Sequence, residues 1–404
     1  MLEQELEKGL PPAAARLLNA IIAELDGCDW CDVVDRGGGS RVQRLPTALR
    51  CDAFAAWGSR TRGGRLFASR NLDWQKNTGI GRYKLVTVFE VTGGAGDGRH
   101  PHSVVADGAR KYATFGFATG FGALAGMAAG GLTVSEMNLD NSHTTFDGPP
   151  FPLRLRMVLE RASSLAEART LWQATNNTDS MNFLIASSRE RAAVAIEAIG
   201  GRFASDAPHP AFSAFFTANS SVEAEATCRV ATDHAAATSA GPRGGTCGSG
   251  FPREPVMHGG VKAIGSPLSE AVWRTNHALH PTVMRTQEPL FNDTTFRYQL
   301  LHQLLAASGG ASATSPAMDD PQAVGVAATL GIKGPDFLSC DASQFPHGSN
   351  IMSVVYAPTD AHEHDRGGPR AWVAWEDATT TGGRWRPAAC STYVRIDFSR
   401  FAWA

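Results

Sequence analysis

Three residues of the types used in nucleophilic catalysis lie in one short stretch of the chain: Cys51, Arg70 and Asp73. A thiol attacks as its thiolate, and a neighbouring arginine lowers the pKa of a thiol. A lone cysteine is usually a small buried apolar residue. The combination predicts a reactive cysteine, if the fold brings the thiol, the guanidinium and the carboxylate together.

The elements that must position these side chains are two strands and a turn. Residues 51–57 and 66–74 have strand-like composition, and the polar residues between them end in Gly-Gly, which favours a hairpin. Folding about that turn places Cys51 level with about Leu72. Arg70 is then a diagonal neighbour on the same face, within reach of a long side chain.

The segment R-N-L-D-W at 70–74, together with Cys51, resembles the cysteine N-terminal-nucleophile hydrolases. These include choloylglycine hydrolases, acid ceramidase-type amidases and the acyl-coenzyme A:6-aminopenicillanic acid acyltransferase family. The last fits best, because the cysteine is internal and follows a leader, residues 1–50. The resemblance implies that the chain cuts itself between Arg50 and Cys51. The new N-terminal cysteine would be the nucleophile through its thiol and the base through its α-amine.

The residue before the cut departs from the family pattern. Many members have a small residue where this chain has Arg50. A trypsin-like protease could also cut after Arg50, and either route exposes the same amine on Cys51.

The resemblance also implies an oxyanion hole built from two asparagines. Asn138, in G-L-T-V-S-E-M-N, matches a residue that donates largely through its main-chain amide, and Asn276, in T-N-H, matches one that donates through its side chain. Such donors are needed because the tetrahedral intermediate carries negative charge on the former carbonyl oxygen. Asn141 could compete with Asn138 for this role. His277 suggests a Cys–His dyad as an alternative, although in the family that histidine is not the base.

Three charged residues complete the implied site. Arg70 and Asp73 match positions that flank the thiol and orient the freed amine, and Arg297, in T-T-F-R-Y, matches a supporting arginine at the start of a helix. The alternative interpretations are an ordinary ion pair at a strand end and a solvated charge on a helix.

The remaining candidate ligands do not predict a metal or a cofactor. Seven cysteines are too few, and odd in number, for a disulfide framework. Cys28 and Cys31 form C-x-x-C without a second pair at metal-binding spacing. The H-E-H run at 362–364 is typical of a solvated loop.

Composition excludes several functions. With 43% hydrophobic and 19% charged residues and a net charge of −2, the 404-residue chain has material for a sizeable core and no basic character that would favour nucleic acid. No apolar run reaches the roughly 18 residues of a membrane span. The acidic N-terminus lacks a secretory signal, which favours a cytoplasmic protein, or a secreted or lysosomal one if a preceding segment is missing. The expected partners are a small-molecule acyl-amide substrate and, as an open alternative, a second copy of the chain.

The expected elements alternate between groups of strands and groups of helices, which favours an α+β fold with antiparallel sheets. The resemblance implies an αββα sandwich, two stacked antiparallel sheets between helical layers. Strands are expected at 85–92, 113–119, 131–139, 181–187, 192–199, 350–357, 371–376 and 392–397, and helices at 1–30, 151–175 and 294–307.

We expect one catalytic domain, residues 51–404, after the leader 1–50. Residues 201–270 are rich in Ala, Gly, Ser, Thr and Pro with little periodicity. They are interpreted as an insertion or lid over the site, or equally as a permissive surface loop.

The function predicted is a self-processing cysteine amidohydrolase that cleaves a linear amide through a thioester. One alternative is an acyltransferase that delivers the acyl group to an amine; hydrolysis is favoured because no coenzyme A site is visible. Another is a lipid amidase or phospholipase B-like hydrolase, and a non-enzymatic one is an uncleaved binding module. The residues that could line a lipid pocket, or belong to the core, are Phe115, Phe117, Phe121, Phe212, Phe215 and Phe216.

Overall fold

The computed structural model describes residues 51–74, 83–91, 110–118, 122–139, 148–200, 211–217, 225–229, 268–284, 287, 292–309, 316–331, 340, 349–359, 368–377 and 386–401. The expected leader with its helix and its C-x-x-C motif, and the H-E-H run, lie outside these ranges.

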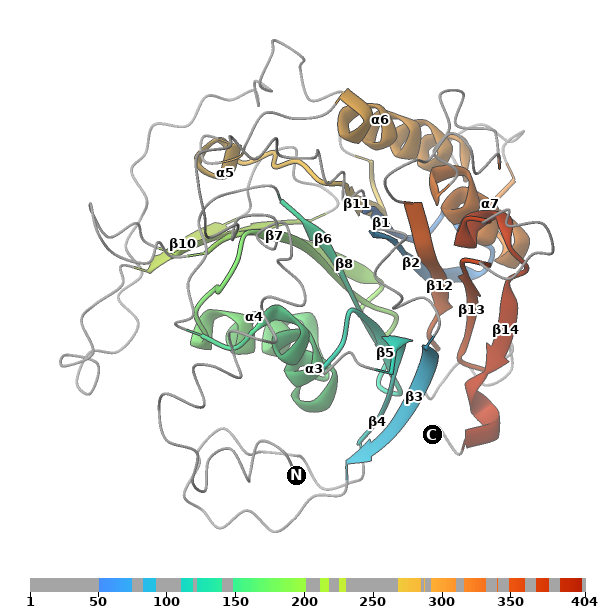
Figure 1. Cartoon of the computed structure of the whole chain (residues 1–404), viewed down its shortest axis with the longest axis horizontal. Coiled ribbons are helices and arrows are strands. Elements are labelled where there is room, and N and C mark those ends of the chain that lie inside the picture. Colours follow the sequence, from blue (N-terminus) through green and yellow to red (C-terminus); the bar gives the residue numbers. More distant parts are fainter. Residues whose placement is uncertain are drawn as a thin grey trace, which may run out of the picture.

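Two antiparallel sheets face each other (Figure 1). The six-stranded sheet has the order β11 (Ala271–Arg274), β1 (Ala53–Gly58), β2 (Gly64–Trp74), β12 (Ser349–Ala357), β13 (Arg370–Trp375), β14 (Val394–Asp397). The eight-stranded sheet has the order β10 (Glu225–Arg229), β9 (Ala211–Phe216), β8 (Ala192–Ile199), β7 (Met181–Ser187), β6 (Leu132–Asn138), β5 (Ala125–Ala128), β4 (Arg110–Phe117), β3 (Lys84–Val91).

Helices cover the outer face of each sheet. Apolar residues of α3 (Phe151–Arg161) and α4 (Leu165–Ala174) pack on the larger sheet, and those of α6 (Asn292–Ala307) and α7 (Asp320–Gly331) pack on the smaller one (Figure 1). A short helix, α5 (Pro281–Met284), and two 3₁₀ turns, η6 (Ala388–Cys390) and η7 (Phe398–Phe401), complete the described elements. The predicted α+β sandwich is confirmed.

Strand periodicity divides the apolar residues between the layers. In β7, Leu184 and Ala186 enter the core between the two sheets, whereas Phe183 and Ile185 face α3 and α4. Successive side chains of a strand point to opposite faces, so a strand buried on both sides is apolar throughout. This explains why β7 and β8 lack the alternation of a solvated sheet.

A capping box begins α4, with one difference from the usual pattern. The hydroxyl of Ser164 accepts the N–H of Glu167 at 3.1 Å and so starts α4. The carboxylate of Glu167 accepts the N–H of Ser163 instead of that of Ser164, at 2.7 Å.

The region 201–270 differs from the prediction in part. Residues 211–216 and 225–229 form β9 and β10, which extend the larger sheet at one edge. The residues F-S-A-F-F at 212–216 are buried on both faces, so they show neither alternation nor helical periodicity. These two stretches are therefore strands of the sandwich.

Most of the phenylalanines considered for a lipid pocket are core residues. Four lie between the sheets and Phe215 lies under the helices, all nearly inaccessible to solvent, whereas Phe121 is outside the described residues. The four between the sheets are Phe115, Phe117, Phe212 and Phe216.

Three further features were not predicted. The short strand β5 lies between two expected strands, in a stretch where no element was predicted, and α7 also falls where none was predicted. Cys340 and Cys390 form a disulfide, although the cysteine count did not suggest one. The prediction failed because spacing alone cannot pair cysteines that are distant in the chain.

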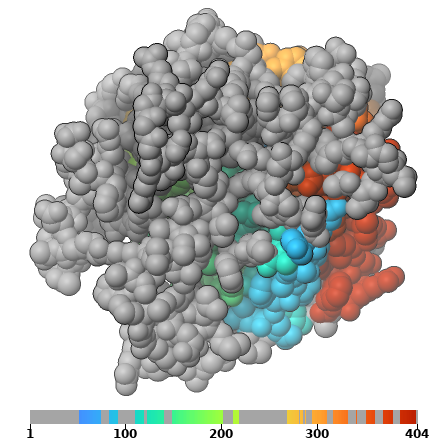
Figure 2. Space-filling view, in the orientation of Figure 1, coloured from blue at the N-terminus to red at the C-terminus, as the bar shows by residue number. Residues whose placement is uncertain are grey.

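The edge strand β3 lies at the surface beside the C-terminal strands (Figure 2). Its Leu85 and Val88 are exposed. Among the helices of the described ranges, none is long and apolar enough to cross a membrane.

Candidate active site

The predicted hairpin positions the cysteine. Strands β1 and β2 pair antiparallel, with Ala55 opposite Ala68. Two main-chain hydrogen bonds between Asp52 and Asn71, of 3.3 and 2.8 Å, extend the pairing beyond the strand. Cys51 therefore lies level with Leu72, and the predicted register is confirmed.

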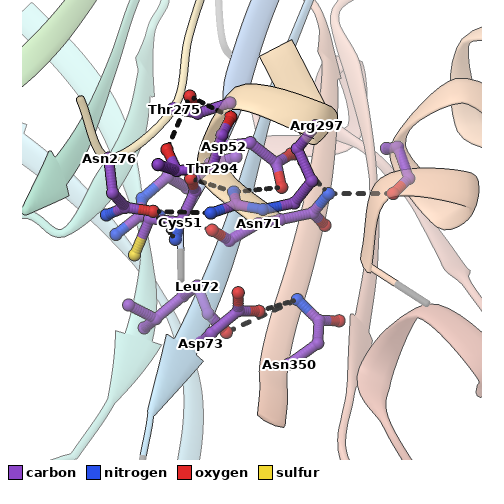
Figure 3. A network of polar contacts seen from close by, with 12 residues as sticks. Cys51, Asp52, Asn71, Leu72, Asp73, Thr275, Asn276, Thr294, Arg297 and Asn350 are labelled. Atoms are coloured by element: carbon purple, nitrogen blue, oxygen red, sulfur yellow. Dashed lines mark hydrogen bonds and ion pairs between the residues drawn. The ribbon is translucent and has the colours of Figure 1, made fainter. Parts of the chain in front are cut away.

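Two side chains hold the main chain of Cys51, whose own side chain is buried (Figure 3). The N–H of Cys51 donates to Oδ1 of Asn276 at 2.5 Å, and its carbonyl oxygen accepts from Nη1 of Arg297 at 2.6 Å. Nη2 of Arg297 also donates to Oδ1 of Asn276, at 3.0 Å. The structure thus brings together three predicted site residues from distant parts of the sequence.

The adjacent carboxylate of Asp52 helps to orient Arg297. The two side chains are fully buried and their charged atoms lie 3.5 Å apart. Nδ2 of Asn71 donates to the other carboxylate oxygen of Asp52 at 2.8 Å and to the carbonyl of Ala327. Asn71 therefore links the hairpin to α7.

Arg70 lies against the thiol of Cys51 and forms a buried ion pair with Glu136, Nη2 to Oε2 at 2.9 Å. Burial alone would lower the pKa of Arg70, but Cys51 and Glu136 raise it above its ordinary value. Burial raises the pKa of Glu136, and Arg70 opposes this shift. The guanidinium therefore stays charged beside the thiol.

Asp73 is held at the same open end of the hairpin as Cys51. Nδ2 of Asn350, on β12, donates to Oδ1 of Asp73 at 3.0 Å (Figure 3). Oδ1 of Asn350 accepts the N–H of Ala389 at 2.8 Å. The pairing of β12 with β2 is irregular between Asn350 and Met352, which sets Asn350 at this point of contact.

The two asparagines expected in an oxyanion hole are in contact. Nδ2 of Asn276 donates to the carbonyl of Asn138 at 2.8 Å. The N–H of Leu139 bonds to Ser180 at 3.1 Å, and Asn138 lies opposite Met181. Because alternate residues of an antiparallel strand turn their main-chain groups to opposite sides, Asn138 directs its N–H and C=O away from β7. Asn141 and Arg50 lie outside the described residues.

A buried carboxylate shapes the loop that carries Asn276. Oε1 of Glu197, on β8, accepts from Nε of Arg274 at 3.0 Å. Oε2 accepts the main-chain N–H groups of Leu279 and His280 at 2.9 and 2.8 Å. Three donors on one carboxylate fix both ends of the T-N-H loop.

Two buried amides complete the support of this loop. Gln287 donates to the carbonyl of Asn276 at 2.8 Å and accepts the N–H of Ala278 at 3.0 Å. Asn182 donates to the carbonyls of Thr275 and His277 at 2.8 and 2.9 Å. Asn276 is therefore held from both its side chain and its main chain.

His277 does not form the alternative Cys–His dyad. Its Nδ1 lies 3.0 Å from the hydroxyls of both Thr275 and Thr294, and its Nε2 has no hydrogen-bond partner within the described parts of the chain. Burial, reinforced by Arg274 and Arg297, lowers the pKa of His277 to about 3. The imidazole is thus a neutral structural residue.

Four buried polar residues of the site were not predicted from the sequence, namely Glu136, Asn182, Glu197 and Asn350. Each is a charged or amide residue within a strand that is otherwise largely apolar. Buried polar groups are costly unless they are paired. Such interruptions of apolar strands are the signal that could have found them.

A comparison with family models finds a similarity to the family that the sequence resembles. Residues 60–227 match the model described as acyl-coenzyme A:6-aminopenicillanic acid acyl-transferase. The match includes Arg70, Asp73 and Asn138, and it agrees with the family resemblance found in the sequence. It does not extend to Cys51 or Asn276.

Solved structures of this fold are also similar. A Caenorhabditis elegans N-acylethanolamine-hydrolyzing acid amidase ortholog is 15% identical, with a TM-score of 0.41, over 78% of this chain and 96% of its own. A variant of the conjugated bile acid hydrolase from Clostridium perfringens is 10% identical, with a TM-score of 0.42, over 87% and 93%. Penicillin V acylase from Agrobacterium tumefaciens is 13% identical, with a TM-score of 0.38, over 87% of each chain. No curated protein matches the chain.

Proposed function

We propose that the chain is a self-processing cysteine amidohydrolase. Cutting between Arg50 and Cys51 removes the leader, residues 1–50, and leaves 51–404 as the catalytic domain. Cys51 then cleaves a linear acyl-amide of small size through a thioester.

The proposal rests on one observation, namely that two side chains form hydrogen bonds with the main chain of Cys51. Its N–H bonds to Asn276 and its carbonyl to Arg297. Once the peptide bond before Cys51 is cut, the same nitrogen becomes the α-amine, and the same two side chains keep it beside the thiol.

In the proposed acylation, the amine of Cys51 takes the proton of the thiol, and Sγ attacks the carbonyl carbon of the substrate. The oxyanion is stabilised by Nδ2 of Asn276 and the main-chain N–H of Asn138, whose carbonyl accepts from that same Nδ2 at 2.8 Å. The ammonium returns the proton to the leaving amine, and the C–N bond breaks. Arg70 stabilises negative charge on sulfur.

The deacylation step distinguishes an amidohydrolase from an acyltransferase. Water attack on the thioester releases a carboxylic acid, whereas attack by an amine transfers the acyl group. The description of the matching family, an acyltransferase, supports the second reaction as an alternative. Both reactions use the same acyl-enzyme, so the ratio of acid to new amide in the presence of an added amine separates them.

The burial of the candidate phenylalanines disfavours a lipid amidase, because these side chains fill the sandwich core. The disulfide between Cys340 and Cys390 favours the secreted or lysosomal alternative over the cytoplasm, because disulfides persist in oxidising compartments.

Trapping the acyl-enzyme tests the proposed chemistry. Wild-type protein and Cys51→Ala are incubated with a panel of p-nitroanilides of increasing acyl length, quenched in acid and analysed by intact and peptide mass. An acyl adduct on the peptide that begins with Cys51, absent in the variant, is the expected result. Processed protein that releases no p-nitroaniline and carries no adduct with any acyl group would favour the binding module.

A further inference from the structure

Glu136 contacts the catalytic arginine, yet the acylation steps above assign it no role. We propose that Glu136 is a positioning residue that holds Arg70 against Cys51 and limits how far the guanidinium stabilises the thiolate. The inference rests on the proposed role of Cys51 as nucleophile and adds a residue that sets its reactivity.

Contacts from two directions fix Arg70. On its own strand, Nη1 donates to the carbonyl of Asn71; across the sandwich, Nη2 donates to Glu136 on β6 at 2.9 Å. Both side chains of the Arg70–Glu136 pair are at most 5% exposed. A buried ion pair of this kind is a poor source of stability, so its value lies in the geometry and charge it imposes.

The location of Glu136 links the pair to the oxyanion hole. Glu136 precedes Asn138 by two residues on β6, so the two share a face of the strand. The same strand therefore carries the partner of Arg70 and the proposed main-chain donor.

The charge of Glu136 opposes that of Arg70 at the thiol. An arginine without a counter-ion would favour the thiolate strongly, whereas a neutralised arginine does so less. A thiolate of very low pKa is a weaker nucleophile. A mechanism that uses the amine as base needs a thiol that still carries its proton. Glu136 keeps the pKa of the Cys51 thiol high enough for this.

Other ionisable groups face the same site, and their effect on the Cys51 thiol is the same in all variants compared below. They come from four further positions around the hairpin, namely Asp52, Asp73, Arg297 and Tyr356.

The test is a titration of the Cys51 thiol in Glu136→Gln. The variant keeps an oxygen that can accept from Arg70 and removes the charge. The thiolate absorbance, taken as the difference from the same protein carrying Cys51→Ala, is followed against pH. We expect the pKa of the thiol to fall by about one unit relative to wild type, with the acid limb of any amidase pH profile shifted in the same direction.

Glu160→Gln is the matched control. Glu160 also pairs with an arginine, Arg156, at 2.6 Å, but on α3, outside the site. Its removal should leave the thiol titration unchanged. If Glu136→Gln does not fold, Glu136→Asp, which retracts the charge from Arg70, is expected to lower the thiol pKa by a smaller amount.

An unchanged or raised thiol pKa in the folded Glu136 variant would overturn the inference. The titration does not require turnover. Wild-type protein that is never cut before Cys51 would therefore contradict the proposed function. The thiol titration would still decide the role of Glu136.

Discussion

Oδ1 of Asn276 accepts the main-chain N–H of Cys51 across a sequence separation of 225 residues. Nδ2 of the same amide reaches the carbonyl of Asn138 on the facing sheet. One side chain thus connects the hairpin of the smaller sheet to the end of a strand in the larger one, at the point where the proposed nucleophile lies.

Replacing Asn276 by alanine should remove both an oxyanion donor and the acceptor of the Cys51 nitrogen. We expect kcat to fall by about 10²- to 10³-fold, the usual cost of one such donor. Steady-state kinetics with the p-nitroanilides whose acyl groups are trapped on Cys51 measure kcat of the variant and of wild type. Activity within tenfold of wild type, with acyl transfer still at Cys51, would contradict the assigned role.

His277 should make the protein lose stability in acid. Its folded pKa of about 3 lies below its ordinary value of about 6.5, so the unfolded chain binds a proton that the folded chain excludes. The contribution is fully present above pH 6.5 and is lost as the pH falls toward 3. Between pH 7 and pH 4.5, the free energy of unfolding should drop by about 2 to 3 kcal/mol more in wild type than in His277→Gln. Urea titrations at both pH values measure this difference, and equal drops would contradict it.

The carboxylate of Glu197 should be a large single contributor to stability. Glu197→Ala leaves Arg274 buried without its counter-ion and takes the acceptor from two main-chain N–H groups. We expect a loss of about 3 to 5 kcal/mol. Glu160→Ala breaks a pair whose arginine is partly exposed and removes the acceptor of the Tyr112 hydroxyl, so it should cost less, about 1 to 2 kcal/mol. Denaturant unfolding of both variants gives the comparison, and similar losses would refute the importance of the Glu197 contacts.

Reduction of the Cys340–Cys390 bond should weaken the support of Asp73. Cys390 lies in η6, next to Ala389, whose N–H holds Asn350 and through it Asp73. We expect reduction to lower the free energy of unfolding by about 2 to 4 kcal/mol. Unfolding curves with and without dithiothreitol measure this loss. The double variant Cys340→Ser, Cys390→Ser should be insensitive to the reductant, and an equally insensitive wild type would show that the bond does not stabilise the fold.

The hairpin could be predicted from sequence because its information is local. The polar turn fixes the pairing of β1 with β2, and the pairing fixes where Arg70 lies relative to Cys51. The strands β7 and β8 were also found within a residue of their bounds, since a short polar turn separates two apolar runs.

The rest of the site depends on contacts that no local pattern encodes. Glu136 and Glu197 find their arginines 66 and 77 residues away in sequence. The strand β9 is buried on both faces and therefore lacks alternation, and the helix α7 is rich in small residues. Asn276 and Arg297 were recognised only through the resemblance to a family.

The central claim is that Cys51 becomes the N-terminal residue by the protein's own chemistry. Intact mass and N-terminal sequencing of purified wild-type protein, beside Cys51→Ala, test it directly. The account predicts a catalytic chain that begins at Cys51 in wild type and an uncut chain in the variant. Cutting in both would assign the step to an outside protease that recognises Arg50, and an uncut wild type would contradict the account.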